Sequence, residues 1–275
     1  MTIRSSYKQD ILDLNYCLFN QAAATTLIRN DSVMMVNPRN PGHQQSNLCC
    51  RIRIDKEDQS AFDTFLQATM DRFLRLGLQP RYIVDELATP SLDTLATWFK
   101  NNKQYTFHVE RDTDIIMSCT FEDFKKIKKN NSSMVRKATL EDVEELTQLI
   151  GAAFGYNNDN TWLRYKLTTQ INDPQTQIYG LVENGQQFLS VAILNAPDGL
   201  PDLIHVNVCG THPDHQRKGL GLICLQQALG QELQQGQTAY LEVYDDIVHA
   251  QRMYEKLGFK AQGTMDSLTV TLPRQ

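Results

Sequence analysis

A glycine-bearing loop between an expected strand and an expected helix is the part of this 275-residue chain that could bind a phosphate. The strand covers 203–211, and Gly219 and Gly221 stand just before an apolar run at 222–233. Glycine lets the backbone approach a ligand closely, and a helix start presents free N–H groups and a positive dipole end. This geometry suits phosphate or pyrophosphate, although tight turns and close helix packing also require glycine.

The residues around this loop alternate between strand and helix patterns. Thr139 begins a helix in a capping motif, and Asn184-Gly185 predicts a hairpin turn between two strands. The expected elements are strands at 134–138, 178–182, 188–194, 203–211 and 239–244, and helices at 143–154, 162–171 and 222–233. These elements predict an α/β domain at 134–275.

The first half of the chain predicts a smaller α/β domain at 1–122, separated from the second by a polar linker at 123–133. Arg111-Asp112-Thr113-Asp114 is expected to be the turn of a hairpin. The expected elements are helices at about 16–28, 58–76 and 91–99, strands at 32–36, 48–54 and 82–84, and the hairpin strands 105–109 and 115–119.

The composition excludes several classes of function. Net charge is −5 with a pI near 5.7, and the basic residues are scattered, so we expect no nucleic-acid partner. The basic run at 125–129 is interpreted as a solvated linker. Six cysteines without a CxxC pair predict reduced thiols and no metal site. No apolar window approaches the roughly 20 residues of a membrane span, so we expect a cytoplasmic protein with no membrane partner.

Two motifs together resemble the GNAT superfamily of acyl-CoA-dependent N-acetyltransferases. The family loop, Gln/Arg-x-x-Gly-x-Gly/Ala, is met by Gln216, Gly219 and Gly221. A later signature, Ala-x-x-x-Tyr-Glu-Lys-Leu-Gly-Phe, is met from Ala250 to Phe259. The resemblance covers roughly 134–272.

The resemblance implies an α/β (α+β) class and a GNAT fold, with a mixed, mostly antiparallel central sheet flanked by helices. The first half repeats the order of strand, long helix, strand, helix and hairpin found at 203–272, but it lacks the glycine loop. We therefore interpret it as a degenerate GNAT-like half, which either packs against the catalytic domain or shapes the acceptor channel.

The resemblance also implies acetyl-CoA as a co-substrate. In the family, loop N–H groups hold the pyrophosphate, and the backbone at the end of the preceding strand pairs with the pantetheine arm and polarises the thioester. The side chains of Arg217 and Lys218 either reach the phosphates or form a solvated surface. The residues that the resemblance assigns to cofactor binding are Cys209, Gly210, Thr211, Gln216, Arg217, Lys218, Gly219, Leu220 and Gly221.

Three residues are candidates for proton transfer. Tyr254 matches the family tyrosine that protonates the leaving thiolate, with a core aromatic as the competing interpretation. His205 stands where several family members have a catalytic glutamate, and it is either the base or a hydrogen-bonded strand histidine. Glu242 is the alternative base or a structurally paired acid, and Asn207 could hold a water molecule.

The leading hypothesis is direct acetyl transfer to a small-molecule or peptide amine in a ternary complex. The alternative is a non-catalytic GNAT-fold protein that binds acyl-CoA or regulates a partner. Ile247 favours the alternative, because the family often has a cofactor-contacting asparagine at this position. Acceptor selectivity is expected in 142–154, 159–171 and 195–201.

Overall fold

The computed structural model describes residues 6–54, 58–128, 135–156, 159–183 and 187–273. They divide into two compact units. Unit 1 contains the residues up to Asn15 and those from Ile115 to Gly263, and unit 2 contains Tyr16 to Asp114 and the residues from Thr264 onward. The helix α1 (Tyr7–Ala22) and the strands β5 (His108–Thr120) and β11 (Lys260–Thr271) therefore contribute to both units.

Unit 1 is built on a sheet in which β10, β9, β8, β7 and β6 are neighbours in that order. β9 and β10 are parallel, and the other pairs in this series are antiparallel. The remaining elements, with their bounds, are α4 (Phe121–Phe124), β6 (Val135–Lys137), α5 (Val143–Phe154), α6 (Thr161–Ile171), β7 (Thr176–Glu183), β8 (Gln187–Asn195), β9 (Leu203–Thr211), α7 (Leu220–Glu232), β10 (Thr238–Tyr244) and α8 (Val248–Glu255).

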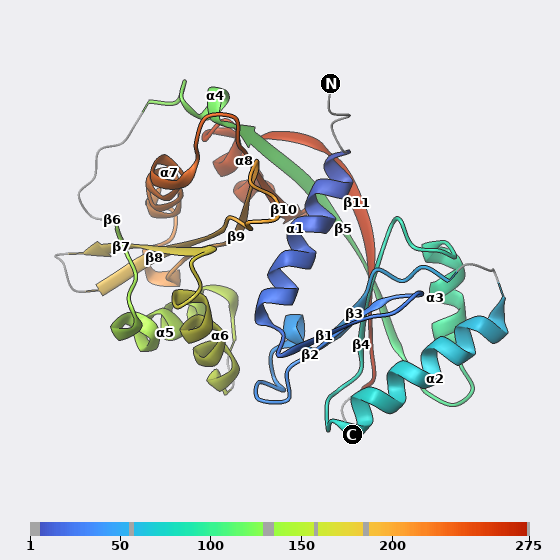
Figure 1. The fold of residues 1–275 in the computed structure, drawn as a ribbon. Coiled ribbons are helices and arrows are strands. Elements are labelled where there is room, and N and C mark those ends of the chain that lie inside the picture. The colour runs from blue at the N-terminus through green and yellow to red at the C-terminus, as the bar shows by residue number, and fades with distance from the viewer. Residues whose placement is uncertain (1–5, 55–57, 129–134, 157–158, 184–186, 274–275) are drawn as a thin grey trace. The chain divides into compact units, whose positions relative to one another are not determined.

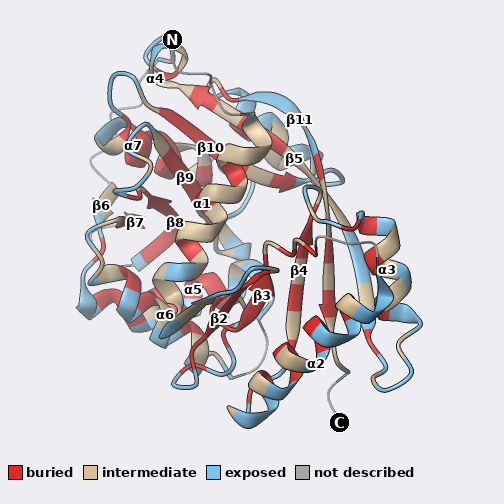
Figure 2. Ribbon diagram, turned by 45° about the vertical axis from the view of Figure 1, so that its right-hand side comes forward, coloured by how far each residue is buried: buried red, intermediate tan, exposed pale blue. Residues whose placement is uncertain are grey.

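Helices cover both faces of this sheet (Figure 1). On one face, α7 buries Cys224, Leu225 and Leu229 against the strands. On the other face, α5 and α6 bury Leu146 and Leu167 in a second cluster. Figure 2 shows that the buried residues concentrate on the strands and on the inward sides of these helices. Because both faces are covered, the central strand β8 is buried at every position after Gln187.

In unit 2 the strands β1, β2, β3, β4 and β11 are neighbours in that order. The helices α2 and α3 cover one face of these strands. Between the helices and the strands lies an aromatic cluster that includes Phe62, Tyr82 and Phe99. The second half of α1 packs Phe19 against the other face. The further elements are β1 (Thr25–Ile28), β2 (Val33–Val36), β3 (Leu48–Cys50), α2 (Gln59–Arg75), β4 (Arg81–Asp85) and α3 (Leu92–Lys100).

The expected repeat between the two halves is present. In unit 2, β3, α2, β4 and α3 repeat the order of β9, α7, β10 and α8, and β3 and β4 are parallel, as β9 and β10 are. Each series then ends in one long strand, β5 or β11, rather than in the predicted hairpin. The two GNAT-like halves of the expected fold class are therefore confirmed, with this correction.

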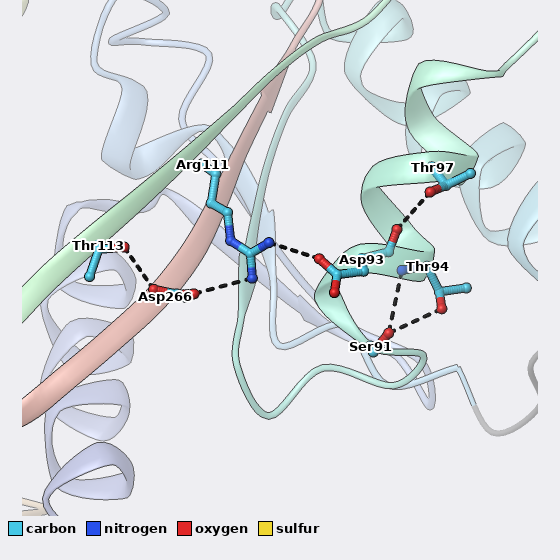
Figure 3. Close-up of polar contacts among 7 residues, drawn as sticks. All are labelled: Ser91, Asp93, Thr94, Thr97, Arg111, Thr113 and Asp266. Atoms are coloured by element: carbon cyan, nitrogen blue, oxygen red, sulfur yellow. Dashed lines mark hydrogen bonds and ion pairs between the residues drawn. The ribbon is translucent and has the colours of Figure 1, made fainter.

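The predicted turn at 111–114 is wrong, because β5 continues through it. Arg111 forms ion pairs with Asp93 (2.7 Å) and Asp266 (3.1 Å), and the Thr113 hydroxyl donates to Asp266 at 2.7 Å (Figure 3). The polar residues that indicated a turn are thus the charged partners of β11 and of the start of α3. Ser91 caps α3 as expected, accepting from the Thr94 N–H.

The first predicted helix is also wrong in its bounds. It begins at Tyr7 and ends at Ala22, because the buried residues Ile11, Leu14 and Leu18 give the helical period. The predicted end of this helix is the strand β1, since the β-branched residues at 25–28 favour an extended pairing with β2. The predicted strand at 48–54 stops at Cys50, where Arg51 adopts a left-handed φ of 51°.

The division into units differs from the boundaries predicted from the sequence. The border between the units falls inside α1, β5 and β11, so each of these elements belongs partly to each unit. Phe124, which lies in the predicted linker, is buried in the core of unit 1. Residues 129–134 of the linker and first strand, and the turn Asn184-Gly185, lie outside the described residues. The domains at 1–122 and 134–275, with a linker at 123–133, stay a prediction. Within the described residues, no helix combines the length and apolar character needed to span a bilayer.

Candidate active site

The strands β9 and β10 separate along their length. Their parallel pairing covers 203–205 of β9 and 238–240 of β10, although β9 continues to Thr211 and β10 to Tyr244. On its other side, β9 pairs with β8 through a bulge that leaves Asn207 without an opposite residue. The side of β9 that faces β10 is therefore open to hydrogen bonding along 207–211.

The glycine loop follows this open segment directly. Gly219 has a left-handed φ of 77° and stands at the N-cap of α7. A Cβ atom on Gly219 would meet nothing within 4 Å, so this glycine is required by the backbone conformation and not by packing. On Gly221, a Cβ atom would approach the Thr211 Oγ1 to 3.1 Å, and this glycine lets the helix start lie against the end of β9.

The other loop residues close the turn and expose two basic side chains. The Gln216 side chain donates to the Thr211 carbonyl at 3.3 Å and so closes the turn. Arg217 also has a left-handed φ, of 62°, and is exposed. The Lys218 ammonium donates to the Asp214 carbonyl at 3.4 Å, and Leu220 is the first residue of α7. The loop thus presents two basic side chains and the free N–H groups of a helix start on one side of β9.

The end of β9 is packed from the α5 side as well. A Cβ atom on Gly210 would lie 3.0 Å from the Phe154 ring, so Gly210 is a glycine because the end of α5 crosses there. The Phe154 and Tyr156 rings are stacked with centroids 6.1 Å apart, and both side chains are exposed. Burial raises the pKa of the Cys209 thiol to about 12, which makes it unreactive.

Tyr254 is buried in the core cluster of unit 1, and its ring centroid lies 5.9 Å from that of Phe259. Burial, with a smaller contribution from Cys209, raises the pKa of its phenol well above the ordinary value. The phenol therefore stays protonated across the working pH range, as a proton donor must. Ile247, which replaces the family asparagine, is packed against the same cluster.

His205 and Glu242 are brought together. The His205 side chain is 4% exposed, and its Nε2 lies 3.6 Å from the Glu242 Oε2. The Glu242 Oε1 accepts a hydrogen bond of 2.9 Å from the Nδ2 of Asn15 in α1. Among the described atoms, the His205 Nδ1 and the Asn207 Nδ2 are buried without a hydrogen-bond partner. The predicted alternation that would place Asn207 beside His205 is interrupted by the bulge.

No pattern in the sequence selects Asn15, which stands 227 positions before Glu242. No local motif surrounds Asn15, and the helix predicted from the sequence, at about 16–28, begins after it. A hollow with a volume of about 530 Å³ lies in unit 2 at the start of α3. Arg111 in its wall is already paired with Asp93 and Asp266, so we assign this hollow no ligand.

Residues 143–259 match the sequence model of the acetyltransferase (GNAT) family. This segment is a GNAT domain. It contains the open end of β9, the glycine loop and Tyr254, but not Asn15. No curated protein matches the chain in sequence.

Solved structures extend the GNAT likeness to the whole chain. A GCN5-related N-acetyltransferase from Kribbella flavida has a TM-score of 0.67 at 16% identity, and the match covers 99% of this chain and 98% of that one. A functionally unknown conserved protein from Staphylococcus epidermidis has a TM-score of 0.69 at 11% identity, with 90% and 94% covered. A GCN5-related N-acetyltransferase from Sphaerobacter thermophilus has a TM-score of 0.54 at 13% identity, with 90% and 83% covered. At these identities the likeness establishes the fold.

The geometry of the candidate site is compatible with acetyl-CoA. The open space in front of Gly219 adjoins the start of α7, where a phosphate would meet N–H groups and a positive dipole end. The open side of β9 offers backbone groups to an extended amide-containing arm, as a neighbouring strand would.

Proposed function

We propose that this chain is an N-acetyltransferase that transfers the acetyl group of acetyl-CoA directly to an amine in a ternary complex. The observation that carries the proposal is the separation of β9 from β10 immediately before the glycine loop and the start of α7. The acetyl-CoA supplies an activated thioester carbonyl, and the chain holds, polarises and deprotonates the reacting groups.

In this proposal the backbone of 217–221 binds the pyrophosphate, and the Arg217 and Lys218 side chains add positive charge. The backbone of Cys209, Gly210 and Thr211 pairs with the pantetheine arm and holds the thioester. Phe154, which is exposed beside Gly210, and Tyr156, which is stacked on Phe154, line the approach of the acceptor.

Three proton transfers complete the reaction. The acceptor arrives as an ammonium ion and loses one proton to His205, with Glu242 as the alternative base. The amine nitrogen then bonds to the acetyl carbon, the carbon–sulfur bond breaks, and Tyr254 gives its proton to the departing sulfur. The nitrogen, which still carries two protons, releases one of them to solvent, and Tyr254 recovers one proton from solvent. His205 releases the first proton, so that the products are the neutral amide, the free thiol and one proton.

A specific observation favours the alternative of a non-catalytic acyl-CoA-binding or regulatory protein. Ile247 is partly buried and packs against the apolar core, at the position where the family often has an asparagine that contacts the cofactor arm. Two measurements decide between the proposals: a thermal-shift titration with acetyl-CoA and CoA, and a thiol-release assay across polyamines, amino acids, arylamines and peptides. Stabilisation together with acceptor-dependent thiol release supports the enzyme. Stabilisation without release from any acceptor supports the binding protein, and no stabilisation contradicts both.

A further inference from the structure

The first half of α1 reaches the candidate base through a chain of contacts within unit 1. The Asn15 Nδ2 donates to the Glu242 Oε1 at 2.9 Å, and the Glu242 Oε2 lies 3.6 Å from the His205 Nε2. A second contact holds the same helix to the same strand, because the Tyr240 hydroxyl donates to the Asp10 Oδ2 at 2.9 Å. Tyr240 is also the β10 residue that pairs with His205.

The chemistry of the imidazole gives these contacts a consequence. A neutral histidine carries one proton, on either Nδ1 or Nε2, and the partner of one nitrogen decides which. The Glu242 carboxylate can only accept, so it favours the proton on Nε2 of His205. The Nδ1 atom then carries the basic lone pair. This atom is buried and has no partner among the described residues, which is a costly state unless a ligand or water is received there.

Glu242 needs support to act in this way. Its side chain is 21% exposed, so rotation toward solvent competes with the position beside His205. The amide of Asn15 holds one carboxylate oxygen and directs the other toward the ring. Asn15 lies outside the segment 143–259 that matches the GNAT model, so the contribution comes from the part of unit 1 that the family motif does not contain.

We propose that Asn15 is a positioning residue that, through Glu242, holds His205 in the Nε2–H tautomer and leaves Nδ1 free to accept a proton. That this proton comes from an acceptor amine rests on the proposed acetyltransferase function; the tautomer itself does not.

The tautomer is measured directly by ¹⁵N NMR of the full chain labelled at its six histidines. The His205→Gln spectrum assigns the His205 signals. We expect wild-type His205 to show a protonated Nε2 and an unprotonated Nδ1, and Asn15→Leu to move both signals toward the average of a mixed population. Glu242→Gln should move them in the same direction. Tyr240→Phe is the matched control, because it removes the hydrogen bond from Tyr240 to Asp10 and should leave the His205 signals in place.

Three results would overturn the proposal: a wild-type His205 protonated on Nδ1, signals that are unchanged in Asn15→Leu, or an equal shift in Tyr240→Phe. Circular dichroism checks that Asn15→Leu folds, and Asn15→Ser replaces it if it does not. Kinetics then separates this proposal from the proposed function. With an acceptor found by the thiol-release assay, Asn15→Leu should lower kcat about 10- to 100-fold at unchanged acetyl-CoA affinity, and should have little further effect in a Glu242→Gln background. If no acceptor reacts but the tautomer shift is seen, the enzymatic function fails and the positioning role stands.

Discussion

Replacing Gly219 with alanine separates a ligand role from a backbone role. Gly219 has a φ of 77°, and the new Cβ would meet nothing within 4 Å in the free protein. The change should therefore cost stability through the left-handed backbone alone, by roughly 1–2 kcal/mol. It should cost binding through a different effect, because the methyl group projects into the space in front of α7 that we assign to the pyrophosphate.

Gly236 supplies the matched control for this strain. It has a φ of 90°, lies after the end of α7, and also has no atom within 4 Å of an added Cβ. Gly236→Ala should lose a similar amount of stability, seen as a similar fall in Tm, and should bind acetyl-CoA as the wild type does. Losing one or two hydrogen bonds to a phosphate, at about 1.5–3 kcal/mol each, predicts at least tenfold weaker binding by Gly219→Ala.

Isothermal titration calorimetry with acetyl-CoA gives the Kd, and thermal unfolding gives the stability of each variant. A Gly219→Ala protein that melts like Gly236→Ala but binds acetyl-CoA with the wild-type Kd would refute the assignment of this loop to the cofactor. Gly219→Leu should abolish binding for the same reason, since its larger side chain occupies more of the same space.

Three further predictions can be tested on the same protein. Saturation with acetyl-CoA should give one cofactor per chain by calorimetry, because no Gly-x-Gly loop follows β3; two bound cofactors would contradict this. Tyr254→Phe should lower kcat by roughly 10²–10⁴-fold with little change in acetyl-CoA Kd, and the wild-type rate should not fall as the pH approaches about 10, because burial raises the pKa of this phenol; a loss of cofactor binding instead would make Tyr254 a binding residue. Asp142 accepts from both the Arg136 guanidinium and the Thr139 N–H, and the Arg136 hydrogen bond is the main cause that lowers the pKa of Asp142 to about 2. The ionised Asp142 carboxylate therefore adds to the free energy of unfolding. This stabilisation is complete above the unfolded pKa of about 3.9 and is lost as the pH falls through 2. In chemical denaturation, Asp142→Asn should be about 1–2 kcal/mol less stable than the wild type at pH 7 and should approach it below pH 2.

The second half of the chain could be predicted closely because its local signals agree with its tertiary packing. The strand β9 has the predicted bounds, and Thr139 and Asp142 form the expected capping box before α5. Apolar periodicity, caps and glycines are all local in sequence, and the family motifs added the order of the elements.

The errors arose where distant partners decide the structure. The local sequence around Arg111 and Thr113 predicts a turn, but both residues bind Asp266 in the structure. Asp266 is more than 150 residues away, so no local pattern indicates this contact. Asn15 is a second example of a residue with a distant partner. Nothing in the sequence around this amide indicates that it binds a carboxylate on β10. The candidate site was thus predictable on the cofactor side, where motifs are local, and less so around the base.

Unit 2 is built from two segments that are far apart in the sequence, and this has a consequence for its folding during translation. Unit 2 needs 264–271 of β11, which pairs with β4, yet these residues follow the whole of the matched GNAT segment. At a translation rate of about 5–20 residues per second, they emerge from the ribosome roughly 8–30 s after Asp114. Until then β4 pairs only with β3, and its other side is an open strand edge, which is a template for wrong pairing. Nascent chains stalled after Gly263 should therefore show unit 2 protease-sensitive, while chains extended beyond Thr271 should protect it.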